Sequence, residues 1–157
     1  MKILAVDLGF ATGNTQMVLV KHDPLAGLEF QVGQVAHPHQ ILSNVDAIFR
    51  LFEDYGVPDL MVMDGWFSNR YLGNRVEDRF RKDYPAWNLE HGNFLVSYIT
   101  FSLDQRQQHF NQLQLMTLGN KKMTFGLDFP PLASVMTAAL LALKFLDSLQ
   151  AKGVAVK

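Results

Sequence analysis

The stretch Ile3-Leu4-Ala5-Val6-Asp7-Leu8-Gly9 lies near the start of the chain and carries its clearest structural signal. Four consecutive apolar residues are typical of a short buried strand. The aspartate and glycine that follow favour a turn, so the strand is expected to stop there. The stretch therefore predicts a strand that carries the carboxylate of Asp7 at its carboxyl end.

The same pattern returns further along, where the apolar run Leu60–Met63 ends in Asp64. Between the two patterns, two further strands and an amphipathic helix are expected at residues 15–20, 29–36 and 41–55. Three consecutive strands with short turns indicate an antiparallel meander, whereas a strand reached through a helix is expected to run parallel to the first. Asp7 and Asp64 are therefore predicted to leave the sheet at the same edge, where open α/β sheets commonly place their sites.

The rest of the chain continues an α/β pattern. A partly helical basic segment, a fifth strand, a glutamine-rich helix and a long final helix that begins at two prolines are expected at residues 66–85, 94–101, 103–118 and 130–150. With 157 residues, the chain has the size of one domain. We therefore expect a single α/β domain over residues 1–157, in which a mixed five-stranded sheet, three antiparallel strands and then parallel ones, is flanked by helices.

The composition excludes several kinds of function. The chain has no cysteine, which rules out disulfides, thiolate metal sites and a cysteine nucleophile. Its net charge is −1, so nucleic-acid binding would need a local basic patch. No apolar run reaches the roughly 18 residues of a membrane span, and the first residues do not resemble a signal peptide. We therefore expect a cytoplasmic protein without a membrane partner.

Two carboxylates at one sheet edge need a counter-charge. Asp7 and Asp64 would repel each other, and a divalent cation relieves that repulsion. Mg²⁺ suits such a place because it prefers oxygen ligands and is typically held by a few carboxylates plus substrate phosphate. Asp128 lies just before the final helix and would complete the cluster if that helix packs back against the sheet.

Asp7-Leu8-Gly9 after a hydrophobic strand, with an acid on a second strand, resembles the ribonuclease H-like superfamily, and in particular RuvC-like Holliday junction resolvases. In that family one or two more acids lie on the last helix, which Asp128 would match. An aromatic residue close behind the second acid stacks on bases at the junction, and Trp66 and Phe67 match that feature. The chain departs from the family in having aspartate at position 64, where glutamate is usual, and in offering one acid before the last helix.

The resemblance implies a metal-dependent endodeoxyribonuclease that cleaves phosphodiester bonds in branched DNA. Two divalent ions, Mg²⁺ or Mn²⁺, about 4 Å apart would activate a water and stabilise the leaving oxygen. Asp7 would bridge the ions, with Asp64 and Asp128 as outer ligands, and Lys121 and Lys122 would steady the scissile phosphate. A homodimer would present two matched sites to the two-fold symmetric junction.

A local patch that suits DNA follows the second acid. Arginine and lysine supply phosphate contacts there, and aromatic side chains can stack on unpaired bases. The candidates are Trp66, Phe67, Arg70, Tyr71, Arg75, Arg79, Arg81 and Lys82. Nearby acids dilute this positive charge.

Each of these features also has an ordinary structural interpretation. Asp7 and Asp64 can anchor turns, and Asp128 can cap the last helix. The two aromatic residues can belong to the core, and the basic segment can be a solvated helix face. His37-Pro38-His39 is interpreted as an ordinary loop rather than a metal pair.

Two other functions stay open. The segment Asp7–Thr15 also resembles the first phosphate loop of actin and sugar-kinase-like proteins, which implies nucleotide binding, although those proteins normally enclose ATP between two such domains. A non-catalytic interaction domain on the ribonuclease H-like fold would explain the aspartate at position 64 and the absence of a fourth acid.

Overall fold

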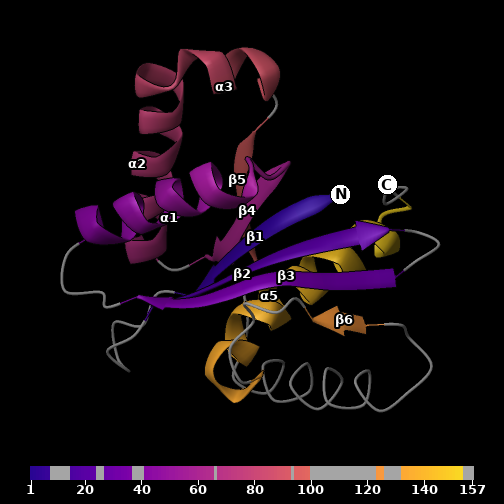
Figure 1. The fold of residues 1–157 in the computed structure, drawn as a ribbon. Coiled ribbons are helices and arrows are strands. Elements are labelled where there is room, and N and C mark those ends of the chain that lie inside the picture. The colour runs from indigo at the N-terminus through magenta and orange to yellow at the C-terminus, as the bar shows by residue number, and fades with distance from the viewer. Residues whose placement is uncertain are drawn as a thin grey trace.

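The computed structural model describes residues 1–7, 15–23, 27–36, 41–65, 67–92, 94–99, 123–125 and 132–153. In this part of the chain a mixed sheet of six strands forms the centre, in the order β5-β4-β1-β2-β3-β6 (Figure 1). The strands are β1 Lys2–Asp7, β2 Thr15–Asp23, β3 Gly27–Ala36, β4 Leu60–Asp64, β5 Leu95–Ile99 and β6 Met123–Phe125. The helices are α1 Ile41–Tyr55, α2 Phe67–Asp83, α3 Pro85–Glu90 and α5 Leu132–Ala151.

The strand pairing confirms the predicted topology. β1, β2 and β3 form an antiparallel meander, and β4 pairs with β1 in parallel. β5 continues the parallel half of the sheet beside β4. The predicted α/β class, with a mixed sheet flanked by helices, is therefore confirmed.

The predicted count of five strands is wrong, because the described sheet has six. The added strand, β6, has three residues and pairs in parallel with β3 at Leu28–Phe30. Three residues are too few to show a periodic pattern, and Gly119-Asn120 shortly before them indicated a turn. The helix expected at residues 103–118 lies outside the described residues.

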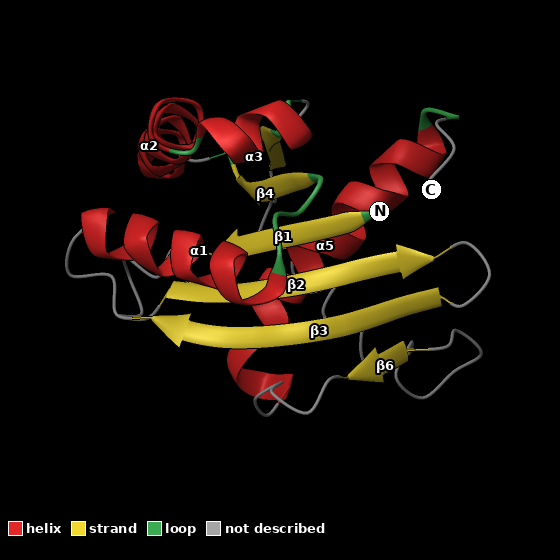
Figure 2. Cartoon of the chain, turned by 45° about the horizontal axis from the view of Figure 1, so that its top comes forward, coloured by secondary structure: helices red, strands yellow, loops and turns green. Residues whose placement is uncertain are grey.

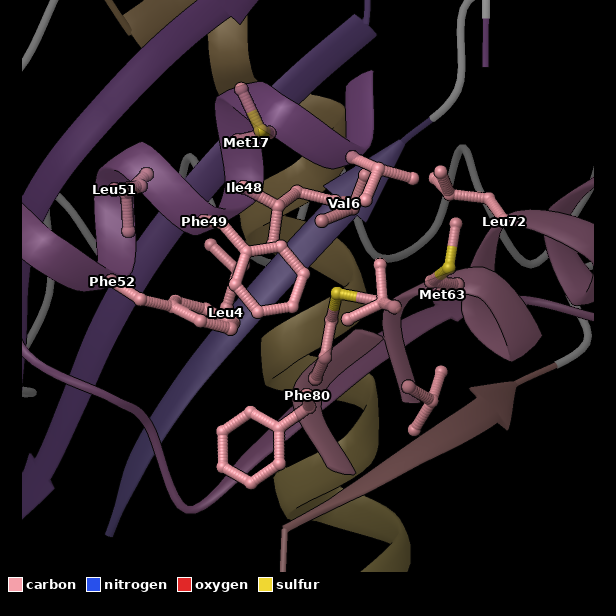
Figure 3. Close-up of a cluster of buried hydrophobic side chains, with 14 of the residues drawn as sticks. Leu4, Val6, Met17, Ile48, Phe49, Leu51, Phe52, Met63, Leu72 and Phe80 are labelled. Atoms are coloured by element: carbon pink, nitrogen blue, oxygen red, sulfur yellow. The ribbon is translucent and has the colours of Figure 1, made fainter. Parts of the chain in front are cut away.

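Helices cover both faces of the sheet (Figure 2). On one face α5 packs on Ile3 and Ala5 of β1. On the other face α1 and α2 pack on Leu4 and Val6 of the same strand (Figure 3). The alternation follows from strand geometry, in which successive side chains point to opposite faces. It also decides on which face the residues at the ends of the strands lie.

The helix α1 forms because its apolar residues recur at helical spacing. Val45, Ile48, Phe49 and Phe52 are all buried against the sheet. The helix is followed by Gly56, whose N–H donates to the carbonyl oxygen of Phe52 at 2.9 Å and whose φ is +90°. Glycine adopts this left-handed conformation without steric cost, so it stops the helix and turns the chain toward β4. Among the described helices, none is both long and apolar enough to cross a membrane.

A close approach of α2 to β5 depends on Gly73. A Cβ atom at this position would lie 2.0 Å from the hydroxyl oxygen of Tyr98 and 3.0 Å from Cγ1 of Val96. Any larger residue must therefore displace β5 or the Tyr98 ring. This contact sets the distance between α2 and the edge of the sheet beside Asp64.

Gly73→Ala is expected to lower the free energy of unfolding by about 1–3 kcal/mol, because the added methyl overpacks the α2–β5 contact. Tyr98→Phe removes the hydroxyl that lies nearest, so the double variant should recover part of that loss. Urea unfolding of the four proteins measures both effects. A double variant as unstable as the sum of the two single variants would contradict the contact.

Candidate functional site

The structure brings Asp7 and Asp64 together at the carboxyl ends of β1 and β4. The parallel register pairs Val6 with Met63, and the next residues along the two strands are Asp7 and Asp64. Neighbouring strands lie about 4.8 Å apart, so the two Cα atoms are close neighbours. The predicted meeting of these two residues at one edge of the sheet is therefore present in the fold.

Both carboxylates lie on the face that α5 covers. Ala5 packs on the α5 side and Asp7 follows it by two residues, so strand alternation gives Asp7 the same side. The same argument applies to Asp64, which follows Val62. Asp64 is only 3% exposed, whereas Asp7 is partly exposed. Asp64 therefore lies in the interior under α5, and Asp7 lies beside it at the end of β1 that solvent can reach.

The backbone around Asp64 is fixed from two sides. Asn69 of α2, itself buried, donates a hydrogen bond from Nδ2 to the backbone oxygen of Asp64 at 2.8 Å. The N–H of Gly65 donates to the carbonyl oxygen of Ile99 at 3.0 Å. These bonds hold the end of β4 against α2 and β5. This role of Asn69 was not predicted, because its position in the sequence follows no recognisable pattern.

Lys144 of α5 interacts with Asp64. Burial lowers the pKa of the Lys144 ammonium, and the negative charge of Asp64 opposes that shift by raising the pKa. The sequence did not identify Lys144 as a site residue. Its signal was present, since it is the one charged residue in the apolar stretch 132–146.

Several predicted site residues lie outside the described part of the chain. These are Asp128, Lys121, Lys122 and Trp66, and the phosphate-loop segment 8–14 lies there too. Phe67 begins α2, but its side chain is not among those described. The approach of Asp128 to Asp7 therefore stays a prediction. Within the described residues, no three His, Cys, Asp or Glu side chains are grouped for a metal ion.

The helix α5 carries one acid, Asp147, and none in its first turn. That residue lies fifteen positions after the start of the helix, so on a helical rise of about 1.5 Å per residue it is roughly 22 Å further along. The final helix therefore adds no carboxylate of its own near its start.

Three basic residues of α2 are bound to acids. Arg79 pairs with Asp46 of α1, Arg81 with Glu77 at 3.5 Å, and Lys82 with Asp78 at 3.2 Å. The three pairs neutralise most of the charge on the C-terminal half of the helix. Three of the predicted DNA-contacting residues thus already have partners within the protein.

Arg79 has a structural role between helices. Its guanidinium lies 4.7 Å from the ring centre of Phe49 and 5.9 Å from that of Tyr84. The hydrogen bond to Asp46 is the main cause that raises the pKa of Arg79. Tyr84 stacks on Phe49 at 4.8 Å, so Arg79 covers an aromatic contact that joins α1 to the start of α3.

Arg70 and Arg75, in contrast, contact aromatic rings. Arg70 lies 4.6 Å from the ring centre of Tyr98, and Arg75 lies 5.6 Å from that of Tyr71. Neither arginine has a carboxylate within 4.0 Å among the described residues. Tyr71 is 49% exposed and lines a shallow hollow of about 390 Å³ on α2, together with Asn74, Arg75, Glu77, Asp78 and Arg81.

The position of Arg70 links the basic helix to the acidic pair. Its Nε donates to the carbonyl oxygen of Gly65, the residue after Asp64, at 3.4 Å. The unneutralised positive charge of α2 therefore lies in its N-terminal half, which begins beside the carboxylates.

Comparisons with known proteins find likeness in structure. No family model matches the chain, and no curated protein matches it in sequence. The fowlpox virus resolvase, solved with Holliday junction DNA, has 15% sequence identity and a TM-score of 0.53, with 95% of this chain and 99% of that chain covered. RuvC of Thermus thermophilus, in complex with a Holliday junction substrate, has 13% identity and a TM-score of 0.51, with 94% and 96% covered.

A third neighbour is Ydc2, the yeast mitochondrial Holliday junction resolvase, with 13% identity, a TM-score of 0.52, and 89% of this chain and 76% of that chain covered. Identities this low show the fold alone. The chain therefore shares the fold of these Holliday junction resolvases, which is the fold that its sequence predicted.

Arg79→Lys is expected to lower the free energy of unfolding by about 1 kcal/mol, because an ammonium keeps the charge but loses the planar contact with Phe49 and Tyr84. Lys82→Ala is the matched control, since it removes an exposed ion pair within one helix and should cost less than about 0.5 kcal/mol. Urea unfolding compares the two variants. A loss in Arg79→Lys no larger than that in Lys82→Ala would contradict a role for the planar guanidinium.

Proposed function

We propose that this protein is a metal-dependent endonuclease that cleaves phosphodiester bonds in branched DNA. The observation that supports this most directly is the pair Asp7 and Asp64, adjacent on parallel strands and directed to one face. The fold adds support, because its solved neighbours are Holliday junction resolvases. The DNA substrate and the endonuclease chemistry are part of the proposal.

The residues at this edge fit a divalent cation. Carboxylate oxygens are the ligands that Mg²⁺ and Mn²⁺ prefer, and Asp7 and Asp64 supply them from two rigid strands. Asp128 is the proposed third carboxylate. The bound cation would activate a water and stabilise the leaving oxygen. The chain itself holds the carboxylates in register and, through Asn69, keeps the end of β4 in place.

The DNA would approach along the N-terminal half of α2. Arg70 and Arg75 supply positive charge and form no ion pair with a described acid, and exposed Tyr71 offers a ring on which an unpaired base can stack. Lys121 and Lys122 are proposed phosphate contacts beside the final helix. We also propose that two copies of the chain act as a dimer, since a four-way junction has two-fold symmetry.

The direct test of the proposal is cleavage of a labelled four-way junction and of a matched linear duplex, with Mg²⁺, Mn²⁺ or EDTA. We expect metal-dependent cleavage of the junction, reduced to background in Asp7→Asn and Asp64→Asn. Asp147→Asn, which removes an acid further along α5, should cleave like the wild-type protein. Equal cleavage by the Asp7 variant would overturn the proposal.

A second candidate function is a non-catalytic domain that binds branched DNA. Two observations favour it: the ammonium of Lys144 interacts with Asp64, and α5 has no acid in its first turn. An internal cation at Asp64 lowers the need for a metal ion there. Junction binding without cleavage under any metal would select this function over the first.

The charge distribution on α2 predicts how the affinity for DNA depends on salt concentration. Arg70→Ala and Arg75→Ala should each lower the slope of log K against log salt concentration by about 1, because each removes one phosphate contact. Arg81→Ala and Lys82→Ala should change the slope less, since these side chains already have acidic partners. Fluorescence anisotropy of labelled junction DNA measures the slopes.

The control for these variants is Lys21→Ala. Lys21 is exposed. In the antiparallel register of β1 and β2 it lies opposite Lys2, at the other end of β1 from Asp7. Its removal should leave the slope unchanged. A similar change of slope in all five variants would mean that DNA binds by overall charge and that the N-terminal half of α2 is not the contact surface.

A further inference from the structure

Gln16 is a polar residue of β2 to which the proposed function gives no role. It pairs with Asp7 in the antiparallel register, and Asp7 in turn lies beside Asp64. Because β4, β1 and β2 are successive strands of the sheet, the three residues form a row across it. With about 4.8 Å between neighbouring strands, side chains on one face of this row can reach a common ligand at the middle position.

The side chain of Gln16 lies on the same face as the two carboxylates. Val18 and Val20 of β2 pack on the α5 side, and Gln16 precedes Val18 by two residues. Thr15 has the opposite parity and shares the face of Met17, which packs on the α1 side. Strand alternation therefore directs Gln16 toward Asp7 and Asp64.

The side-chain oxygen of Gln16 is buried and accepts no hydrogen bond from the described residues. An amide oxygen buried without a donor costs about 1–3 kcal/mol, so a hydrogen-bond donor or a cation is expected beside it. Amide and carboxylate oxygens belong to the same class of hard ligands, which suits Mg²⁺ and Mn²⁺. The chemistry and the place of this oxygen thus agree with a cation at Asp7.

We propose that Oε1 of Gln16 is a ligand of the divalent cation that Asp7 binds. The site then consists of a row of three oxygen-bearing side chains, Asp64, Asp7 and Gln16, and the inference rests on the metal-dependent function proposed above. It also explains how the edge can bind a cation although the described residues contain no group of three acids or histidines. Lys144 interacts with Asp64, at the far end of the row from Gln16.

The test is Mn²⁺ binding to the full chain without DNA, measured from the electron paramagnetic resonance signal of free Mn²⁺. Gln16→Leu should weaken binding at least about 10-fold, the smallest loss typical even of residues that only orient metal ligands. Gln16→Glu should tighten binding, because it adds a negative charge at the same place. Gln31→Leu, the same change at a partly buried glutamine of β3, should bind Mn²⁺ like the wild-type protein.

Thermal unfolding separates a ligand from a structural residue. Without metal, Gln16→Leu should be no less stable than the wild-type protein, because it removes a buried oxygen that lacks a donor. With Mn²⁺, the wild-type protein should gain stability according to its affinity, and Gln16→Leu should gain less. A loss of stability without metal, with unchanged Mn²⁺ affinity, would overturn the inference.

The outcomes also separate this inference from the proposed function. If Asp7→Asn abolishes Mn²⁺ binding and Gln16→Leu does not weaken it, the inference fails and the metal-dependent function stands. If the wild-type protein binds no Mn²⁺, both fail.

Discussion

The parallel pairing of β1 with β4 is the interaction on which the rest of the structure depends. Its register places Asp7 beside Asp64, and strand alternation then gives both residues the face that α5 covers. The same pairing leaves Gln16 of β2 on the other side of Asp7. A slip of one residue would turn Asp64 to the opposite face and break the row of polar residues.

Much of this arrangement could be predicted from the sequence, because short apolar runs that end in Asp-Leu-Gly and Asp-Gly mark both strands. The meander, the parallel β4 and α1 at Ile41–Tyr55 were predicted for the same reason, as their patterns are local. β6 was missed because it has only three residues. Asn69, Lys144 and Gln16 were not predicted to lie beside the two carboxylates, because their places there depend on which strand or helix they meet after folding.

The helix α2 illustrates what a sequence pattern leaves undecided. Its basic residues looked equivalent in the sequence, yet Arg79, Arg81 and Lys82 have acidic partners and Arg70 and Arg75 have aromatic ones. Asp46, the partner of Arg79, comes from α1, thirty-three residues earlier. The resulting imbalance concentrates positive charge in the half of α2 that begins beside Asp64.

Anomalous X-ray diffraction from a crystal of the protein soaked in Mn²⁺ would show whether Asp7 and Asp64 bind a metal ion together. We predict a Mn²⁺ peak at the carboxyl ends of β1 and β4, with oxygens of Asp7 and Asp64 at about 2.0–2.5 Å, the range of hard-cation ligands. An absence of any peak at this edge, with the Lys144 ammonium bound to Asp64 instead, would contradict it.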